Sequence, residues 1–156
     1  MYLENLNFEI NCLSWENSDD RILKSNQLVM EHFKIPVKYE IKTIPHGTWI
    51  DEKMNKCSSE VVGFLDSDCV VTNREIVERS IKYVLKNKTF IGISQVSNHI
   101  PPRTHVYAAP AFFFIHKECW ELLGKPSFIH NQHSDVAEEI SYIAEKKQKS
   151  YRCIYP

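Results

Sequence analysis

Two aspartates stand one residue apart in the tripeptide Asp66-Ser67-Asp68. Alternate residues of an extended chain point the same way, so both carboxylates are expected on one face. Two carboxylates at that spacing repel each other and raise one pKa, and a divalent cation relieves the repulsion. Mg²⁺ and Mn²⁺ prefer oxygen ligands and often combine one or two carboxylates with substrate phosphates. The tripeptide therefore fits a metal-bound diphosphate, with a solvated acidic turn as the alternative.

The segment that must position this tripeptide is Glu60–Leu65, whose run Val61-Val62-Gly63-Phe64-Leu65 is apolar on both faces. That pattern is typical of a central strand that helices cover on both sides. Open parallel sheets bind ligands beyond the carboxyl ends of their strands, and Asp66 stands directly after such an end. The sequence therefore places the two aspartates at a ligand-binding edge.

Strand and helix patterns alternate along the rest of the chain. We predict further strands at Phe8–Leu13, Val37–Ile44, Thr89–Val96, Val106–Ile115 (interrupted by Pro110) and Ser150–Tyr155. We predict helices after an N-cap at Ser18, after a capping box at Thr72-Asn73-Arg74-Glu75, and at Trp49–Cys57, Lys117–Leu123 and Asp135–Lys147. Ser97–Thr104 contains two prolines and is predicted to be a loop. This order predicts one α/β domain over residues 1–156, with a mainly parallel central sheet and helices on both faces.

The sequence lacks the motifs of several classes of enzyme. With only four glycines, the chain has no dinucleotide-binding G-x-G-x-x-G, no P-loop and no G-x-S-x-G nucleophile turn. Its 20 acidic and 19 basic residues nearly cancel, which argues against nucleic acid as a partner, except as a modified-base acceptor. The five cysteines form no C-x-x-C pair, and neither a secretory signal nor an apolar run of membrane-spanning length occurs. We therefore expect a cytoplasmic protein with no membrane span and with reduced thiols.

The run from Glu60 to Val70 resembles the apolar strand and DxD motif of glycosyltransferases with the GT-A fold, especially the family 2 type. The resemblance extends from about Phe8 to Tyr151. The first strand and the helix after Ser18 look like the opening unit of that family, and Ala108–Lys117 is similar to its acceptor-side strand. His133–Glu139 looks like its late acidic segment, which opens a helix and supplies the catalytic base in inverting members.

This resemblance implies a metal-dependent glycosyltransferase that moves a sugar from a UDP- or GDP-type donor to a hydroxyl acceptor. Asp66 would contact the ribose or the metal, and Asp68 would coordinate Mn²⁺ or Mg²⁺ beside the diphosphate. Asp135 would be the general base, a role that contributes about 10²–10⁴-fold. The alternative for Asp135 is a helix N-cap paired with Glu138, which leaves a retaining mechanism open.

The resemblance also implies weaker site candidates. Ser14 and Trp15 follow the first strand, where the family borders the nucleotide, and His46 stands at the end of the second strand. His133 is a candidate third metal ligand, and Arg103 is a candidate phosphate partner. Each of these has a plain alternative, as a core, turn or surface-loop residue.

Ile44-Pro45-His46-Gly47 stands where the family usually has an aspartate for the nucleotide base, so the base is not predicted. One rival function is a nucleotidyltransferase, which normally needs a glycine-rich, basic loop after the first strand. Asn11–Asp20 contains neither glycine nor a basic residue. The other rival is a non-catalytic nucleotide-sugar-binding or interaction module.

Overall fold

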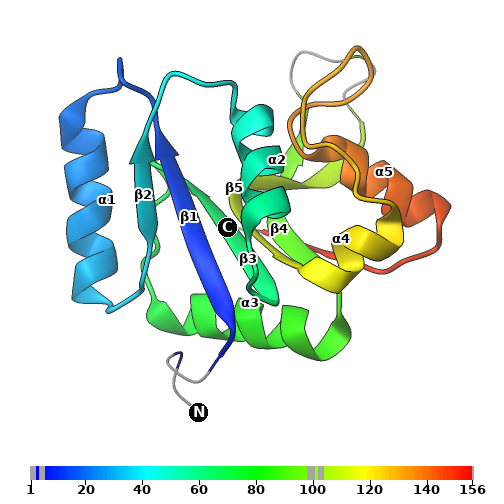
Figure 1. Ribbon diagram of the computed structural model, residues 1–156, viewed down its shortest axis with the longest axis horizontal. Coiled ribbons are helices and arrows are strands. Elements are labelled where there is room, and N and C mark those ends of the chain that lie inside the picture. Colours follow the sequence, from blue (N-terminus) through cyan, green and yellow to red (C-terminus); the bar gives the residue numbers. More distant parts are fainter. Residues whose placement is uncertain (1–2, 4–5, 98–100, 102–103, 156) are drawn as a thin grey trace.

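The computed structural model describes residues 3, 6–97, 101 and 104–155. The elements are β1 (Phe8–Ser14), α1 (Asp20–His32), β2 (Lys38–Ile41), α2 (His46–Lys56), β3 (Val61–Asp66), α3 (Arg74–Asn87), β4 (Phe90–Val96), β5 (Val106–His116), α4 (Lys117–Leu123), α5 (Glu138–Lys146) and β6 (Arg152–Ile154). They form one six-stranded sheet in the order β2-β1-β3-β5-β4-β6 (Figure 1). Every strand runs parallel to the others except β5, which is antiparallel to β3 and β4. The predicted α/β architecture with a mainly parallel sheet is confirmed.

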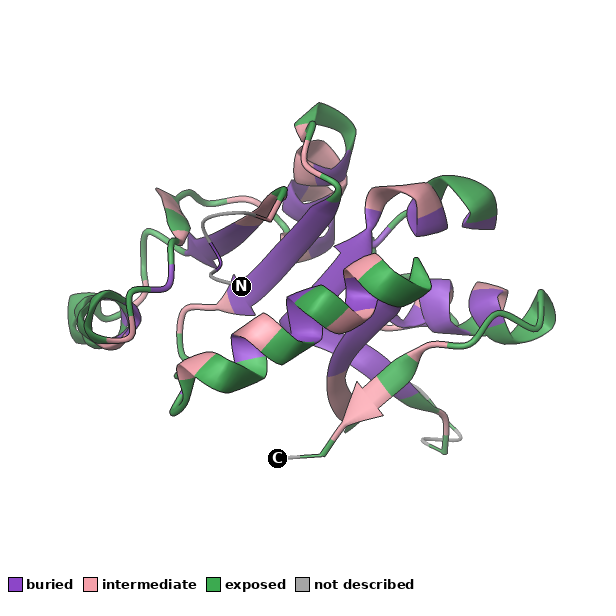
Figure 2. Cartoon of the chain, turned by 90° about the horizontal axis from the view of Figure 1, so that it is seen from below, coloured by how far each residue is buried: buried purple, intermediate pink, exposed green. Residues whose placement is uncertain are grey.

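Helices cover both faces of the sheet, and each face has its own apolar core. Buried side chains of α2, α4 and α5 pack with Phe64 on one face. Those of α1 and α3 pack with Leu65 on the other (Figures 1 and 2). Phe64 and Leu65 are both fully buried, as a two-sided strand requires. Burial of each side chain stabilises the fold by about 1.5–3 kcal/mol.

Gly63 directly precedes these two residues, at a position where a side chain would not fit. A Cβ added there would lie 2.5 Å from Cε1 of Phe114 on the neighbouring strand. The glycine thus lets the buried Phe114 ring pack directly against β3, which fixes the strand that ends at the aspartates.

Strand β5 continues through Pro110, contrary to the predicted interruption. Its pairing with β4 jumps from Gly92↔Phe113 to Ile93↔Ala109, so Pro110 falls in a bulge. Proline has no N–H to donate, and a bulge leaves the extra residue out of the hydrogen-bonded ladder. Beyond the bulge, Val106–Ala109 pairs with β4 and extends past the carboxyl end of β3.

Helices α1, α3 and α5 begin at other residues than predicted. Asp19, not Ser18, caps α1, and Asn73, rather than the Thr72–Glu75 box, caps α3. Their side-chain oxygens accept the backbone N–H of Arg21 and Glu75 at 2.9 and 2.7 Å. Helix α5 begins at Glu138 instead of Asp135, because Ala137 has φ 64° and breaks the helical path.

The segment between β2 and β3 also differs from the prediction. Strand β2 ends at Ile41 rather than Ile44, and α2 begins at His46, three residues before the predicted start. Pro45 is the N-cap residue, a position where its missing N–H costs nothing. His46 is therefore the first residue of a helix that faces the site.

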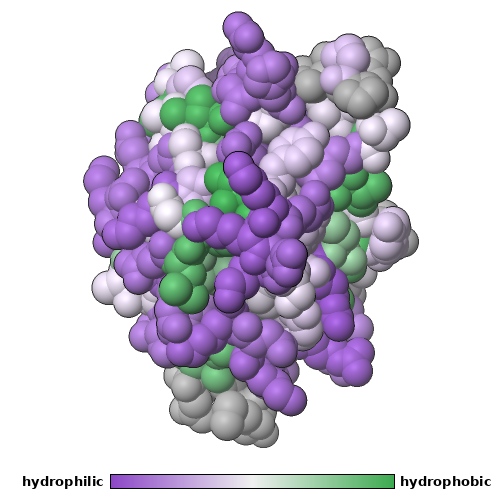
Figure 3. Space-filling view, turned by 90° about the vertical axis from the view of Figure 1, so that its right-hand side faces the viewer, coloured by the Kyte–Doolittle hydropathy of each residue, from purple (hydrophilic) through white to green (hydrophobic). Residues whose placement is uncertain are grey.

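Strands β4 and β6 start later than predicted, at Phe90 and Arg152. Most of the predicted loop Ser97–Thr104 lies outside the described residues. Within the described part, no helix is both long and apolar enough to cross a bilayer. Seen from the side of α4 and α5, the surface is mainly hydrophilic, with small separate apolar groups (Figure 3).

Candidate functional site

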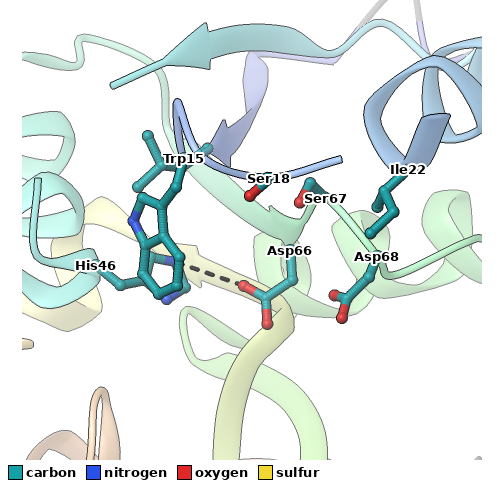
Figure 4. A pocket seen from close by; sticks show the side chains of 8 residues that line it. Trp15, Ser18, Ile22, His46, Asp66, Ser67 and Asp68 are labelled. Atoms are coloured by element: carbon teal, nitrogen blue, oxygen red, sulfur yellow. Dashed lines mark ion pairs between the residues drawn. The ribbon is translucent and has the colours of Figure 1, made fainter. Parts of the chain in front are cut away.

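A cleft of about 240 Å³ opens where β3 ends. Its lining comes from β1, the β1–α1 connection, the start of α1 and α2, and the turn after β3, and consists of Leu13, Trp15, Ser18, Ile22, His46, Asp66, Ser67 and Asp68. The Cys69 N–H donates to the Asp66 carbonyl at 3.0 Å and closes that turn. Figure 4 shows the side chains of Asp66 and Asp68 next to each other, with both carboxylates pointing to the same side. The structure thus brings together the two aspartates as their spacing predicted.

The charges of this cleft are almost all negative. Burial raises the pKa of Asp66, the nearby His46 opposes that rise, and the charge of Asp68 adds to it. Nε2 of His46 lies 3.6 Å from Oδ1 of Asp66, while burial lowers the pKa of His46. No lysine or arginine lines the cleft among the described residues. Among the described lining residues, negative charge therefore predominates.

The residues present fit a divalent metal ion only in part. The described residues include no group of three or more His, Cys, Asp or Glu side chains that could hold one. Asp66 and Asp68 supply two carboxylates, and Mg²⁺ or Mn²⁺ commonly completes such a set with water and substrate phosphate oxygens. The donor set thus fits a metal that binds together with a diphosphate.

The other predicted site residues are placed as follows. Trp15 lines the cleft with half of its surface exposed, and its indole N–H donates to the Ile44 carbonyl at 3.0 Å. Ser14 is buried and is not part of the lining, and its carbonyl accepts the Lys42 N–H. His133 lines a separate cleft with Asn131 and Tyr142, so the structure does not bring it to the two aspartates. Arg103 lies outside the described residues.

Gly47 brings the segment that precedes Asp135 close to this edge. A Cβ on Gly47 would lie 2.5 Å from the carbonyl oxygen of Phe128, so only glycine permits this approach. Asp51 of the same helix accepts the Phe128 N–H at 2.8 Å and the Ser127 hydroxyl at 2.6 Å. Helix α2 therefore carries His46 at its start and also anchors the chain that leads to Asp135.

Tyr107 connects Asp135 to the same edge. It lies beyond the β5 bulge, is only 1% exposed, and donates its hydroxyl to Oδ2 of Asp135 at 3.3 Å. Burial raises the pKa of Tyr107, and the charges of Asp135, Glu138 and, to a smaller extent, Asp66 add to the rise. Because Tyr107 lies past the carboxyl end of β3, its contact places Asp135 at the carboxyl edge of the sheet, although Asp135 is not among the residues that line the two-aspartate cleft.

Asp135 also has a structural role at the start of α5. Its Oδ1 accepts the Val136 N–H at 2.7 Å, and Oε2 of the buried Glu138 accepts the Asp135 N–H at 2.7 Å. Oε1 of Glu138 lies 2.9 Å from Nδ1 of His105. Only one of the two contacts of the predicted capping box is thus present, and the N-cap residue of α5 is Ala137, which makes no side-chain cap hydrogen bond.

Sequence reasoning missed a buried group behind the cleft. Asn26 of α1 is fully buried, and its side chain donates to the Cys69 carbonyl at 2.9 Å and accepts the Tyr39 hydroxyl at 2.8 Å. It therefore ties the turn after Asp68 to α1 and β2. The sequence signal that could have identified Asn26 is its position on the same helix face as the apolar residues Leu23 and Met30.

No protein-family model and no curated protein matches the chain. Among solved structures, the chain is similar to 4-diphosphocytidyl-2C-methyl-D-erythritol synthase from Anaerococcus prevotii, with a TM-score of 0.62 and 10% identity over 96% of this chain and 89% of that one. It is similar to a mannosyltransferase from Pyrobaculum calidifontis in complex with GDP-Man and Mn²⁺, with a TM-score of 0.63 and 8% identity. That match covers 96% of this chain and 55% of the mannosyltransferase. It is also similar to the catalytic domain of Drosophila β1,4-galactosyltransferase 7 in complex with xylobiose, with a TM-score of 0.61 and 11% identity over 93% and 64%.

Identities this low show the fold alone. The chain spans 55% and 64% of the two glycosyltransferases, and 89% of the synthase. The family 2 assignment within the glycosyltransferases stays a prediction. The chain has the nucleotide-diphospho-sugar transferase-like fold that glycosyltransferases and nucleotidyltransferases share.

Proposed function

We propose that this protein transfers a sugar from a nucleotide-diphosphate donor to a hydroxyl acceptor, with a divalent metal ion at Asp66 and Asp68. The observation that carries the proposal is the cleft at the end of β3, which presents two adjacent carboxylates and, among the described residues, no lysine or arginine. Such a cleft repels a bare diphosphate and accepts one that arrives with Mn²⁺ or Mg²⁺.

Each residue of the cleft has a role in this proposal. Asp68 and Asp66 hold the metal, and Asp66 also orients the ribose. The exposed face of Trp15 is available to stack on the nucleotide base, because its indole N–H is already held by the Ile44 carbonyl. His46 lies beside Asp66 at the start of α2 and contributes a ring nitrogen to the donor site.

The acceptor side uses Asp135. A divalent cation, when bound, would neutralise the negative charge on the leaving diphosphate. Asp135 takes the proton from the acceptor hydroxyl, and Tyr107 positions it through the contact to Oδ2. With Asp135 as the base, the transfer inverts the sugar configuration.

A second candidate function is nucleotidyl transfer, since the chain spans 89% of the erythritol synthase at a TM-score of 0.62. That reaction must bind a nucleoside triphosphate, which carries more negative charge than a diphosphate. The described lining of the cleft offers no lysine or arginine for it. Sugar transfer therefore agrees better with the charges of the site.

The donor site is tested by thermal unfolding with UDP, GDP, CDP and dTDP, each with and without Mn²⁺. A ligand at 100 times its Kd stabilises by about 2.7 kcal/mol, or roughly 5–10 °C at about 2–4 °C per kcal/mol. We expect a shift that needs both Mn²⁺ and one nucleotide, and that is lost in Asp68→Ala but kept in Asp20→Ala. No shift with any of the four nucleotides contradicts the proposal.

Turnover separates the candidate reactions. With nucleotide-diphosphate sugars and Mn²⁺, sugar transfer releases the nucleoside diphosphate. With nucleoside triphosphates and sugar 1-phosphates, nucleotidyl transfer releases pyrophosphate. Release of pyrophosphate alone assigns the second function, and nucleotide binding without either product assigns a non-catalytic binding module. The identity of the acceptor stays a prediction, with a modified DNA base as one candidate. The cytoplasmic location also stays a prediction.

A further inference from the structure

A second cleft lies away from the carboxyl edge, between α3 and the last strand, β6. Its volume is about 840 Å³, and its lining consists of Ile76, Arg79, Ser80, Lys82, Tyr83, Lys86, Asn87, Ile91, Arg152, Cys153 and Ile154. Figure 2 shows α3 crossing this side of the molecule with the half-buried β6 beside it. The lining includes four basic residues and no acidic one.

The positive charge of this cleft is only partly compensated. Arg79 lies 3.4 Å from Glu75, and Lys82 lies 3.9 Å from Glu78, which already binds Arg74 at 2.8 Å. Lys86 and Arg152 pair with no carboxylate in the described part of the chain. The guanidinium of Arg152 instead lies 4.2 Å from the centre of the Tyr83 ring. The cleft therefore favours an acidic ligand.

The strand that borders the cleft is the last one of the sheet. Strand β6 pairs with β4 on one side, and no strand among the described residues pairs with its other side. Its residues alternate between the two faces: Arg152 and Ile154 contact the α3 side, while Cys153 packs with the core under α4 and α5. A strand added to β6 would thus direct every second side chain into the basic cleft.

The opposite edge of the sheet is different. Strand β2 carries Lys38 and Glu40, which pair with Glu9 and with Lys42. Paired charges of this kind protect an edge from strand addition. On β6, the charged residue Arg152 adds to a basic surface instead of being neutralised.

We propose that the edge of β6 and the α3 cleft form a docking surface for an extended acidic segment of a partner protein. The segment adds to the sheet beside β6, and its alternate acidic side chains face Lys86, Arg152, Lys82 and Arg79. Ile76, Ile91 and Ile154 form an apolar floor for the stems of those side chains. This surface does not involve the residues of the proposed sugar transfer.

The probe is a blocked five-residue peptide in which glutamate alternates with valine, titrated into ¹⁵N-labelled protein. We expect amide shift changes at residues 152–154 and along α3, and at least a threefold weaker Kd for Lys86→Glu. Lys24→Glu is the matched control, because Lys24 is also an exposed helix lysine without an ion pair in the described chain. A peptide of equal charge with proline in place of valine lacks the backbone N–H of every second residue and has a fixed φ at those positions. It is therefore a poor partner for strand pairing and should bind at least threefold more weakly.

Three results overturn the proposal. The first is the absence of shifts at β6 and α3 at millimolar peptide, and the second is equal binding by Lys86→Glu and the unchanged protein. The third is equal binding by the proline peptide or by inorganic phosphate, which would show a simple anion site and no strand addition.

Discussion

The two acidic regions at the carboxyl edge of the sheet differ in how their charges are compensated. At the end of β3, Asp66 and Asp68 lie together, and the described residues offer them one weak partner, His46 at 3.6 Å from Asp66. At the start of α5, Asp135 and Glu138 accept hydrogen bonds from Tyr107, from two backbone N–H groups and from His105. The same residue type thus has few compensating partners in one place and is held by hydrogen bonds in the other.

This difference has an energetic meaning. Uncompensated carboxylates destabilise the fold and gain stability when a cation binds, whereas hydrogen-bonded carboxylates stabilise the fold by themselves. Loss of a carboxylate should therefore affect ligand binding in the first region, and geometry and turnover in the second. The following substitutions test that contrast.

The largest effect is expected from Asp68→Asn. Removal of one of the two proposed carboxylate ligands should weaken Mn²⁺ binding in the presence of nucleotide by at least about 100-fold, above the roughly 10–100-fold cost of losing a supporting group. Titration of Mn²⁺ followed by electron paramagnetic resonance measures this Kd. Asp135→Asn serves as the control and should bind Mn²⁺ as the unchanged protein does. Equal weakening in both variants would remove the distinction between the regions.

Asp135→Asn should act on turnover instead. If Asp135 is the base, kcat falls by about 10²–10⁴-fold while the nucleotide-dependent thermal shift is kept. Steady-state release of the nucleoside diphosphate measures kcat. A loss below tenfold would leave Asp135 with its helix-start role alone and favour a retaining transfer.

Asn26→Leu tests whether the buried amide positions the metal-binding turn. The substitution leaves the Tyr39 hydroxyl and the Cys69 carbonyl without their partner, at a cost of about 1–3 kcal/mol for each buried polar group. At about 2–4 °C per kcal/mol, the melting temperature should fall by several degrees. The KM for the donor should rise in the same variant. Ser25→Leu, at an exposed neighbour in α1, should change neither quantity.

The smallest effect is expected from Asp66→Asn in the absence of metal. Burial raises the pKa of Asp66 in the folded chain, so the folded state holds this proton to higher pH than the unfolded state does. Stability of the unchanged protein therefore decreases as pH rises from the unfolded pKa, about 3.9, through the raised folded pKa.

The Asp66→Asn variant has no ionisable group at this position, so its stability does not show this decrease with rising pH. Its melting temperature should exceed that of the unchanged protein by a few degrees at most at pH 7.5, and the gain should shrink toward pH 4. Melting curves at both pH values measure it, with Asp20→Asn as an exposed control. A lower melting temperature for Asp66→Asn at pH 7.5 would show that His46 compensates Asp66 fully.

The elements of the fold were predictable where the signal is local. Both faces of Val61–Leu65 are apolar, and the strand is buried on both sides. The helix predicted at Lys117–Leu123 ends at Leu123, where Gly124 follows in the left-handed conformation that glycine adopts readily. Helix starts were less certain because Ser18 and Asp19, or Thr72 and Asn73, are adjacent capping residues, and only the packed helix chooses between them.

The sequence by itself determined the adjacent carboxylates of Asp66 and Asp68, since their spacing at the end of a strand is a local property. Only the tertiary structure decided what surrounds them. The insertion of antiparallel β5 between β3 and β4 brings Tyr107 to Asp135 across 28 residues, and the packing of α1 brings Asn26 to Cys69 across 43. Strand order and bulges depend on contacts between distant segments, which no local period of hydrophobic residues encodes.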